Sequence, residues 1–361
     1  MLHRHLAAAM LICQVPTLVA AQPHLDLVPT CRDCRVRVEE VVRLQSLWEN
    51  GSTPAMPTAF ASLGRGEWLL ANSNTSLVDR FDAGGRHVGA FARRGAGPGE
   101  ISRAGALVPW AGDSVLIVDH GLGRFQIFAS SGVYARSGPW IGAAPTQVLV
   151  RPGARFIAPM NRNTNDAFGI PFHEFGSDGA LLRSFGAAPN EKIASRDQLP
   201  RYRVGAATAA DGSFWSIDAR SPRLRHWDRN GAPDAEWVLP FRDFVPIVTT
   251  REGSPPGAEF TVLEQTADGL LVVAMAFRAR DFQRSYGDGR PVDGGASRVV
   301  EDVGRYFDTR VFVLDARTRT LLTYADIDPI LFGSLGAGRF WGVASGGYNG
   351  EVVVLQLTPT R

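Results

Sequence analysis

The sequence has few cysteines, a single lysine and one long apolar run, and each scarcity limits what the 361-residue chain can be. Two of its three cysteines, Cys31 and Cys34, lie close together, and such a pair alone is an incomplete zinc site. Lys192 is the one lysine among 38 basic residues, and the formal net charge is only +2. We therefore expect no electrostatic field of the kind that binds nucleic acid or a membrane surface.

The long apolar run lies at the start of the chain. Residues 6–19 follow a short basic region, and the run is too short and too interrupted to span a bilayer well. Small residues then precede Gln22, which fits cleavage at that point, so residues 1–21 are predicted to be a signal peptide. We expect an exported chain, periplasmic or extracellular, with no transmembrane segment.

Residues 22–35 are predicted to be an N-terminal segment that carries the motif CRDC. A c-type haem would need histidine after the second cysteine, where Arg35 stands, and a thioredoxin-like redox pair would need a βαβ setting that is missing. In the oxidising compartment that export implies, we expect a disulfide between Cys31 and Cys34. Closing so short a loop stabilises a fold by about 2 kcal/mol or less in the chain-entropy estimate.

An internal repeat organises the rest of the sequence. The clearest copies are EWLLANSNTSLVDRF (67–81), SVLIVDHGLGRFQIF (114–128) and SFWSIDARSPRLRHW (213–227), each a short apolar strand, a polar turn and an alternating strand. Glycine-containing turns flank each copy, and glycine supplies the positive φ that tight hairpins need. Anchoring six copies on the first residues of this strand gives the series Trp68, Val115, Phe156, Phe214, Leu270 and Phe340.

The steps between these anchors are 47, 41, 58, 56 and 70 residues, close to the length of a propeller blade with loop insertions. One antiparallel unit cannot bury both of its faces, whereas six closed in a ring can. The last copy ends after about three strands, so we expect residues 36–44 to supply the missing strand. The sequence therefore predicts an all-β, six-bladed propeller of four-stranded antiparallel blades over residues 36–361, with an insertion at 277–310.

The stretch GAFARRGAGPGEI (89–101) is the one candidate for a phosphate-binding loop. A P-loop needs lysine and a hydroxyl after its last glycine, but Glu100 and Ile101 stand there. A dinucleotide fingerprint needs a helix directly afterwards, and residues 102–110 form a poor helix sequence. The glycines are therefore interpreted as the connection from one blade to the next.

The stretch FARRGAGPGEI…VLIVDHGLGRFQIFASSG (91–132) resembles the NHL-type repeat. That repeat pairs a G-x-G-x-G turn with a strand that ends in Val-x-Asp and a strand that ends near Phe. With its CxxC-headed N-terminus, the chain looks like the secreted bacterial six-bladed propellers of that broad group. The resemblance implies the fold, while activity has to be argued from the site.

Polar residues recur where the repeat's apolar strand ends, and they form a predicted ring at the channel mouth: Asn72, Asp119, Asn161 and Asp218. Oxygen-rich rings suit hard cations such as Ca²⁺, for which Asp119 and Asp218 would carry the charge, although Asp and Asn are also ordinary turn residues. No cofactor is required by the sequence. His120 is the one histidine placed there as a candidate general base, and Arg93 and Arg94 lie in the connection that faces it.

Three connections at this face are long, residues 186–205, 241–260 and 277–310, and long loops gathered on one face favour binding or a lid. We predict a monomeric, non-enzymatic exported propeller that binds a protein, peptide or glycan there, and no nucleic acid. The alternative is a metal-dependent propeller hydrolase or lyase similar to the gluconolactonase-like enzymes, whose Glu-Gly-Pro opening has no counterpart here. Peptide-amidating lyases are another group of propeller enzymes, but they need several histidines in the channel, and His120 is the one histidine placed there.

Overall fold

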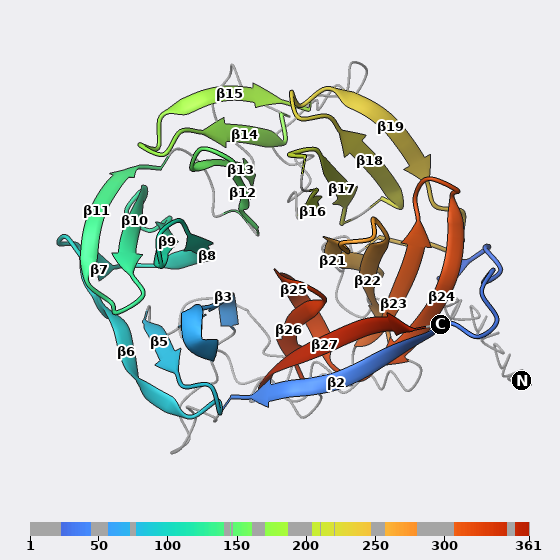
Figure 1. Ribbon diagram of the computed structural model, residues 1–361, viewed down its shortest axis with the longest axis horizontal. Helices are drawn as coiled ribbons and strands as arrows, with labels where there is room; N and C mark the ends of the chain where they lie inside the picture. Colours follow the sequence, from blue (N-terminus) through green and yellow to red (C-terminus); the bar gives the residue numbers. More distant parts are fainter. Residues whose placement is uncertain are drawn as a thin grey trace, which may run out of the picture.

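The computed structural model describes most of the strand-forming chain. The described residues are 23–44, 57–72, 77–140, 145, 147–160, 170–186, 204–209, 211–219, 221–246, 257–279, 307–344 and 351–360. They form six four-stranded antiparallel sheets arranged as blades around a centre, which is a six-bladed β-propeller (Figure 1). The predicted signal peptide, residues 1–21, lies outside the described residues.

The first three blades follow one another along the chain. Blade 1 consists of β3 (Pro57–Ser62), β4 (Trp68–Asn72), β5 (Val78–Phe81) and β6 (His87–Arg94), with the short β7 (Glu100–Ile101) parallel to β6 and a 3₁₀ turn at Gly64–Gly66. Blade 2 consists of β8 (Ala104–Trp110), β9 (Ser114–Asp119), β10 (Arg124–Ala129) and β11 (Tyr134–Pro139). Blade 3 consists of β12 (Leu149–Arg151), β13 (Arg155–Pro159), β14 (Phe172–Phe175) and β15 (Leu181–Phe185).

The last three blades complete the ring. Blade 4 consists of β16 (Val204–Thr208), β17 (Phe214–Asp218), β18 (Arg223–Trp227) and β19 (Pro233–Val238). Blade 5 consists of β21 (Glu259–Gln265), β22 (Leu271–Arg278), β23 (Phe307–Asp315) and β24 (Thr320–Ile327). Blade 6 consists of β25 (Ile330–Gly336), β26 (Arg339–Val343) and β27 (Val352–Thr360), and its fourth strand is β2 (Arg35–Arg43).

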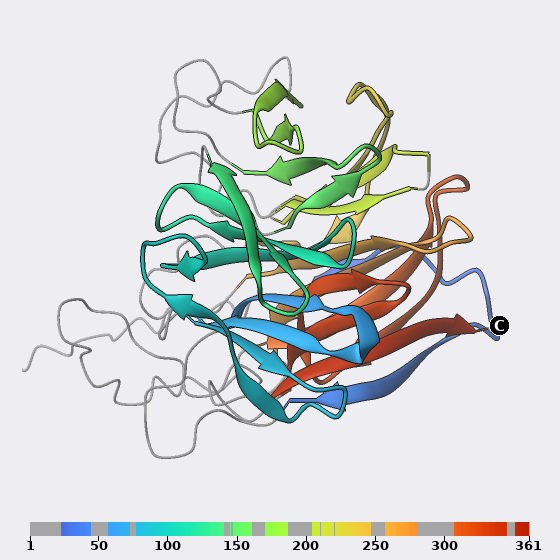
Figure 2. The same ribbon diagram turned by 60° about the vertical axis from the view of Figure 1, so that its left-hand side comes forward.

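The strand from the N-terminal region therefore closes the ring, as the sequence predicts. β2 pairs antiparallel with β27 through eight residue pairs, from Arg35 with Thr360 to Arg43 with Val353. Both views place β2 along the outer side of β27 (Figures 1 and 2). Because β2 and β27 come from opposite ends of the chain, the blade joins its two ends and leaves no open seam.

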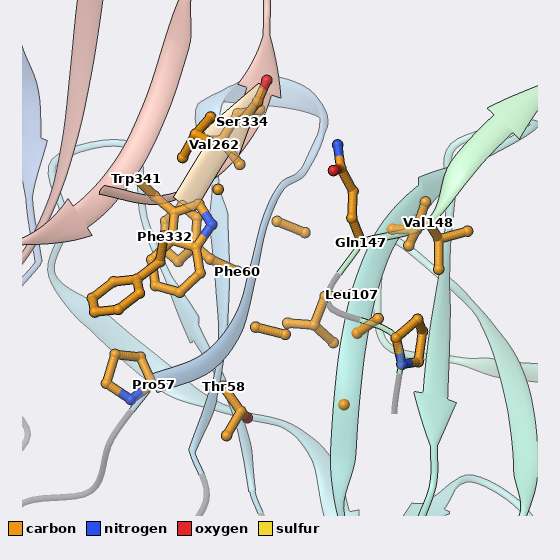
Figure 3. A pocket seen from close by; sticks show the side chains of 18 of the residues that line it. Pro57, Thr58, Phe60, Leu107, Gln147, Val148, Val262, Phe332, Ser334 and Trp341 are labelled. Atoms are coloured by element: carbon orange, nitrogen blue, oxygen red, sulfur yellow. The ribbon is translucent and has the colours of Figure 1, made fainter. Parts of the chain in front are cut away.

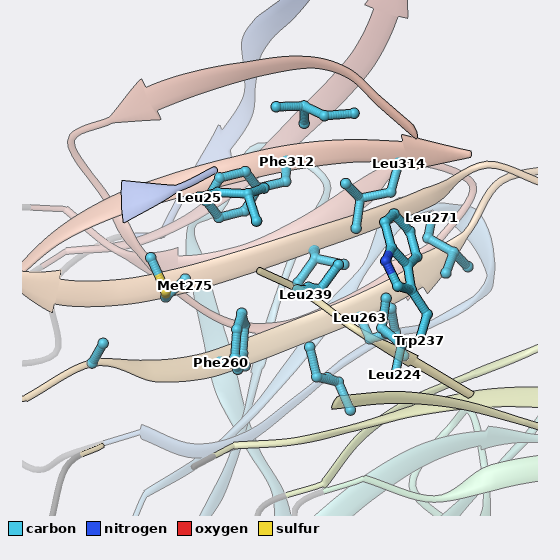
Figure 4. Close-up of a cluster of buried hydrophobic side chains, with 14 of the residues drawn as sticks. Leu25, Leu224, Trp237, Leu239, Phe260, Leu263, Leu271, Met275, Phe312 and Leu314 are labelled. Carbon is cyan, nitrogen blue, oxygen red and sulfur yellow. The ribbon is translucent and has the colours of Figure 1, made fainter. Parts of the chain in front are cut away.

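The N-terminal segment before β2 also binds blades 4 and 5 together. β1 (His24–Leu25) pairs with β20 (Phe241–Arg242), and Leu25 packs into a buried cluster with Phe260 and Phe312 (Figure 4). Farther along, the backbone N–H of Thr30 donates to the carbonyl of β24 residue Leu321 at 2.9 Å. Cys31 and Cys34 form a disulfide just before β2 begins.

Large aromatic residues set the register of the blades. In blades 1 to 4 a residue at or next to the start of the second strand pairs with an aromatic residue of the third strand, as in Trp68 with Phe81 and Phe214 with Trp227. In blades 5 and 6 the corresponding partner is a leucine. The two side chains of such a pair lie on the same face of the sheet and bury apolar surface together, so the repeat can be recognised in the sequence. Blade 5 differs from the predicted anchor by one residue. Leu271 is the paired residue, because Leu270 closes the turn that begins at Thr266.

The glycine-rich stretch is the connection between blades 1 and 2, and side chains already occupy its backbone N–H groups. Glu100 Oε2 accepts from the N–H of Gly97 at 2.8 Å, and Gln126 Oε1 accepts from Gly99 at 3.0 Å. Arg124 donates to the carbonyls of Gly97 and Glu100 at 2.8 and 2.7 Å. The loop is therefore fastened to β10, and a phosphate would have to displace a carboxylate from it.

The predicted long connections and the predicted absence of a transmembrane segment can be compared with the structure only over the described residues. Strands β22 and β23 run into both ends of the stretch 277–310, where Arg278 pairs with Phe307, and the remainder lies largely outside the described residues. Much of 186–205 and part of 241–260 also fall outside them. In the described part of the chain, no helix has the length and apolar character needed to cross a membrane.

Candidate functional site

A cavity of about 370 Å³ lies at the centre of the ring (Figure 3). Its walls come from the innermost strands β3, β8, β21 and β25, together with Trp341 of β26 and the segment before β12. We call it the central cavity. Pro57, His120 and Pro145 lie at its end on the loop face, which we define as the face where each second strand ends and each inner strand begins.

One wall of the central cavity is aromatic. The rings of Phe60 and Trp341 stack with centroids 5.6 Å apart, and Phe332 lies 5.5 Å from Trp341. In Figure 3 these three rings face Leu107 and Val148 on the opposite wall. The described lining contains no Asp, Glu, Lys or Arg side chain. The central cavity therefore suits an uncharged and largely apolar group.

All four inner strands that line the central cavity carry a β-bulge. The register of β3, β8 and β21 each skips one residue against the neighbouring strand, and that of β25 skips two. The skipped residues are Thr58, Gly105, Thr261, Phe332 and Leu335, and all five line the cavity. A bulge turns an extra residue out of the ladder and is frequent beside functional sites. Sequence reasoning missed these residues, because a bulge shows only in the pairing of two strands.

Two polar atoms of the lining are buried without a hydrogen-bond partner among the described residues: His120 Nδ1 and Thr261 Oγ1. Thr58 occupies the same bulge position in blade 1, but its hydroxyl donates to the carbonyl of Ala104 at 3.1 Å. Burial lowers the pKa of His120, and the charge of Arg103 lowers it further, so its imidazole is neutral at pH 7. The neutral ring can donate or accept at Nδ1, depending on its tautomer.

The predicted polar ring occupies equivalent positions in three blades. Each member forms the last pair between the inner and second strands, as Asn72 does with Pro57, Asp119 with Ala104 and Asp218 with Val204. These residues thus lie at the loop-face ends of their blades. The fourth member, Asn161, lies outside the described residues.

The carboxylate of Asp119 is turned into its blade and has no exposed surface. Its Oδ1 accepts from the N–H of Arg103 at 2.9 Å and its Oδ2 from that of Ser102 at 3.0 Å. This explains why β9 ends in an aspartate, because Asp119 fixes the chain entering β8. A cation at Asp119 would compete with both N–H groups. The described residues contain no group of three or more metal-ligating His, Cys, Asp or Glu side chains.

Arg93 and Arg94 stand apart from the cavity. Both are exposed at the end of β6, the outermost strand of blade 1, and neither is part of the described cavity lining. Figure 1 places β6 and β7 on the outside of the ring. Of the predicted ligand-binding residues that the structure describes, His120 is therefore the one that lies in the central cavity wall.

A buried carboxylate lies behind the cavity wall. Glu264 is 5% exposed, and its two oxygens accept from Ser334 Oγ and from the N–H of Gly338, each at 2.6 Å. Ser334 lines the cavity, so these bonds fix a piece of its wall while joining blades 5 and 6. Burial raises the pKa of Glu264 above its ordinary value. No sequence motif marks this residue.

A serine, a histidine and an aspartate also meet in blade 4, which the sequence order does not reveal. His226 Nε2 lies 3.1 Å from Ser213 Oγ, and its Nδ1 lies 2.5 Å from Asp234 Oδ1. The Ser213 hydroxyl, however, donates to Asp211 Oδ1 at 2.6 Å, a bond that lowers the pKa of Asp211. Because Ser213 is also only 5% exposed, these groups brace the turn and lack an activated nucleophile.

Comparison with known proteins identifies a fold and no family. No family model matches the sequence, and no curated protein matches it. The structure is similar to that of a DUF4221 family member from Bacteroides vulgatus, with a TM-score of 0.55, 7% identity and coverage of 94% of this chain and 100% of the other. A Bacteroides fragilis protein that is predicted to be exported gives a TM-score of 0.55 at 9% identity, covering 94% of this chain and 98% of the other.

Virginiamycin B lyase from Staphylococcus aureus aligns with a TM-score of 0.47 and 11% identity, over 90% of this chain and 100% of the other, and at that score the likeness carries no weight. The resemblance to the NHL group stays a prediction, since no sequence comparison identifies that repeat here. The two neighbours with a TM-score of 0.55 show that the chain is similar in fold to bacterial β-propellers, one of which is predicted to be exported. Because their sequence identity is below 10%, the comparison supports the fold and nothing about function.

Proposed function

We propose that the chain is an exported, non-enzymatic propeller that binds a protein, peptide or glycan on its loop face. The observation that carries this proposal is the central cavity, which reaches that face and whose described lining has an aromatic wall and no charged side chain. A channel mouth of this kind offers apolar contact area and few polar groups, as binding sites do. A peptide ligand would place one side chain in it.

Selection of displayed peptides on the immobilised mature protein tests this proposal. Val148 lines the central cavity and is only partly buried, so Val148→Trp should fill the space without disrupting a strand. Val133 is 66% exposed beside the β10–β11 turn, on the face opposite the loop face, so Val133→Trp is the matched control. We expect selected peptides to bind wild type and Val133→Trp and to lose binding to Val148→Trp. Peptides that bind all three proteins alike would contradict the proposal.

The alternative, a propeller hydrolase or lyase, is favoured by one observation. His120 has a lowered pKa and a buried Nδ1 without a described partner, and a neutral imidazole is the form that acts as a general base. Metal analysis of the purified protein separates the two functions. Stoichiometric Ca²⁺ or Zn²⁺ would favour the metal-dependent enzyme, as would turnover of a lactone that His120→Ala abolishes.

A further inference from the structure

The polar side chains of the central cavity are mostly used by the chain itself. The hydroxyl of Thr58 donates to the carbonyl of Ala104 at 3.1 Å, and that of Ser334 donates to Glu264 at 2.6 Å. Thr261 Oγ1 is buried, so it does not face the cavity. Each hydroxyl of a glycan is both donor and acceptor and loses its water on burial, so a cavity with few free polar atoms disfavours a glycan.

Trp341 is an exception, because the chain leaves its indole N–H unused. Nε1 has no hydrogen-bond partner among the described residues, and it is not one of their buried polar atoms. In Figure 3 this nitrogen lies on the edge of the ring that faces the opposite wall, where Leu107 and Gln147 are. An indole N–H is a donor only. The aromatic wall therefore offers a hydrogen-bond donor to the central cavity.

A second tryptophan provides a matched comparison. Trp68 stacks on Phe60 with ring centroids 5.8 Å apart, and Trp341 stacks on the same ring at 5.6 Å. Trp68 Nε1, however, is buried without a described partner, and Trp68 is not part of the described cavity lining. The fold thus supplies two tryptophans that contact one phenylalanine and differ in whether the indole N–H reaches the cavity.

A glycine keeps space open beside the Trp341 nitrogen. Gly333 lines the cavity and pairs with Trp341 across β25 and β26, so a side chain there would stand on the same face as the indole. Its Cβ would come within 2.4 Å of Trp341 Nε1. Gly333 is not among the described glycines with positive φ, so its backbone conformation does not require glycine. The glycine instead provides room at the indole nitrogen.

We propose that the central cavity binds an uncharged aromatic group that carries a hydrogen-bond acceptor, such as an aryl ketone, and that Trp341 Nε1 donates to that acceptor. The described lining has no Asp, Glu, Lys or Arg side chain, so an ionic group would lose its hydration without gaining a counter-charge. The rings of Phe60 and Phe332 beside Trp341 provide the apolar contact for the ligand ring. The group can belong to a free small molecule or to an aromatic residue of a bound peptide with its carbonyl. The inference rests on the proposed function in treating the loop face as the entrance.

Equilibrium dialysis of the mature protein with two probes of nearly the same shape tests the inference. 2-Acetylnaphthalene carries a carbonyl oxygen where 2-isopropenylnaphthalene carries a CH₂ group. The ratio of their affinities isolates the acceptor, because the naphthalene ring is common to both. Trp341→Phe keeps an aromatic ring and removes the N–H, so we expect it to lower the ratio in favour of the ketone about tenfold. Trp68→Phe is the matched control and should leave the ratio unchanged.

Two further variants alter access to the site. Gly333→Ala should lower the same ratio, because its Cβ meets the indole nitrogen. Val148→Trp should abolish the binding of both probes by filling the cavity. An unchanged ratio in Trp341→Phe would overturn the inference, and so would a fall of the same size in Trp68→Phe. Absence of binding to wild type, or binding that Val148→Trp leaves unchanged, would overturn it as well.

A measurement on the wild-type protein makes the test independent of how the variants fold. With ¹⁵N-labelled tryptophan, the indole N–H resonance of Trp341 should shift more on addition of 2-acetylnaphthalene than on addition of 2-isopropenylnaphthalene. The resonance of Trp68 should stay in place with both probes. Equal shifts of the Trp341 resonance with the two probes would contradict the proposed hydrogen bond.

A competition assay separates this inference from the proposed function. A selected peptide that 2-acetylnaphthalene displaces has its side chain in the central cavity, which supports both. A peptide that binds together with 2-acetylnaphthalene supports a free small molecule as the occupant. If no peptide or glycan is captured but the ketone binds with the expected dependence on Trp341, the proposed macromolecular function fails while the cavity site stands.

Discussion

Replacing Gly85 with alanine tests whether the N-terminal strand closes the ring in solution. Gly85 lies in the turn between β5 and β6 with φ of +82°, and a Cβ there would come within 2.3 Å of the Arg43 carbonyl oxygen and 2.8 Å of Val42 Cγ2. Both of these neighbours belong to β2. The substitution therefore forces a methyl group against the strand that comes from the other end of the sequence.

The magnitude has two parts. Alanine with positive φ costs about 1–2 kcal/mol, and inserting a methyl group against backbone costs typically about 1–3 kcal/mol more. Gly112 provides the control, because it has φ of +69° in the β8–β9 turn and a Cβ there would have no neighbour within 4 Å. We expect Gly112→Ala to lower the free energy of unfolding by about 1–2 kcal/mol and Gly85→Ala by about 2–5 kcal/mol.

Urea unfolding followed by tryptophan fluorescence measures both losses under one set of conditions. The excess loss in Gly85→Ala reports the contact with β2, because the backbone strain is common to the two variants. Equal losses would mean that β2 does not lie against blade 1 in solution, and the ring closure described here would be refuted. A truncated chain that lacks residues 22–44 should, in the same assay, show no excess loss from Gly85→Ala.

Three other predictions concern carboxylates and the disulfide. Because burial raises the folded-state pKa of Glu264 above its ordinary value of 4.5, its contribution to stability is fully present below that pH and is lost as the pH rises through the raised pKa. Wild type should therefore lose stability relative to Glu264→Gln as the pH rises above 4.5, and a parallel course of the two urea-unfolding series would contradict this. Cys31→Ser with Cys34→Ser should lower the free energy of unfolding by about 2 kcal/mol or less, whereas a much larger loss would show that the staple does more than close its short loop. Asp119→Ala should destabilise the protein by about 2 kcal/mol or more even with chelator present, since two buried N–H groups lose their acceptor, and if the ring does bind Ca²⁺, adding Asp218→Ala should abolish any Ca²⁺-induced rise in melting temperature.

The fold was predictable because its signals are local. Apolar strands and glycine turns recur in order along the chain, and in blades 1 to 4 so does an aromatic partner of the second strand, so the blade number and the closing role of 36–44 follow from counting. The pairing of Trp68 with Phe81 recurs in other blades as Phe156 with Phe175. The predicted start of the second strand in blade 5, Leu270, was wrong by one residue. Leu270 belongs to the turn that begins at Thr266, and the hydrogen bonds that close this turn leave no apolar pattern in the sequence.

The candidate site was predictable only in part, because its features arise between strands. The repeat placed His120 at the channel mouth, and the structure places it in the cavity wall. The bulge that turns Thr261 inward depends on how β21 pairs with β22, and its unpaired hydroxyl depends on what surrounds it in space. Glu264 and Ser334 lie 70 residues apart in the sequence, so their hydrogen bond leaves no local pattern.

A crystal structure of the mature protein with a selected peptide bound tests the central claim most directly, because it locates the ligand on the molecule. The account predicts a peptide side chain in the central cavity beside Phe332 and Trp341. A peptide bound on the outer surface of the blades, with the central cavity left unfilled, would contradict it.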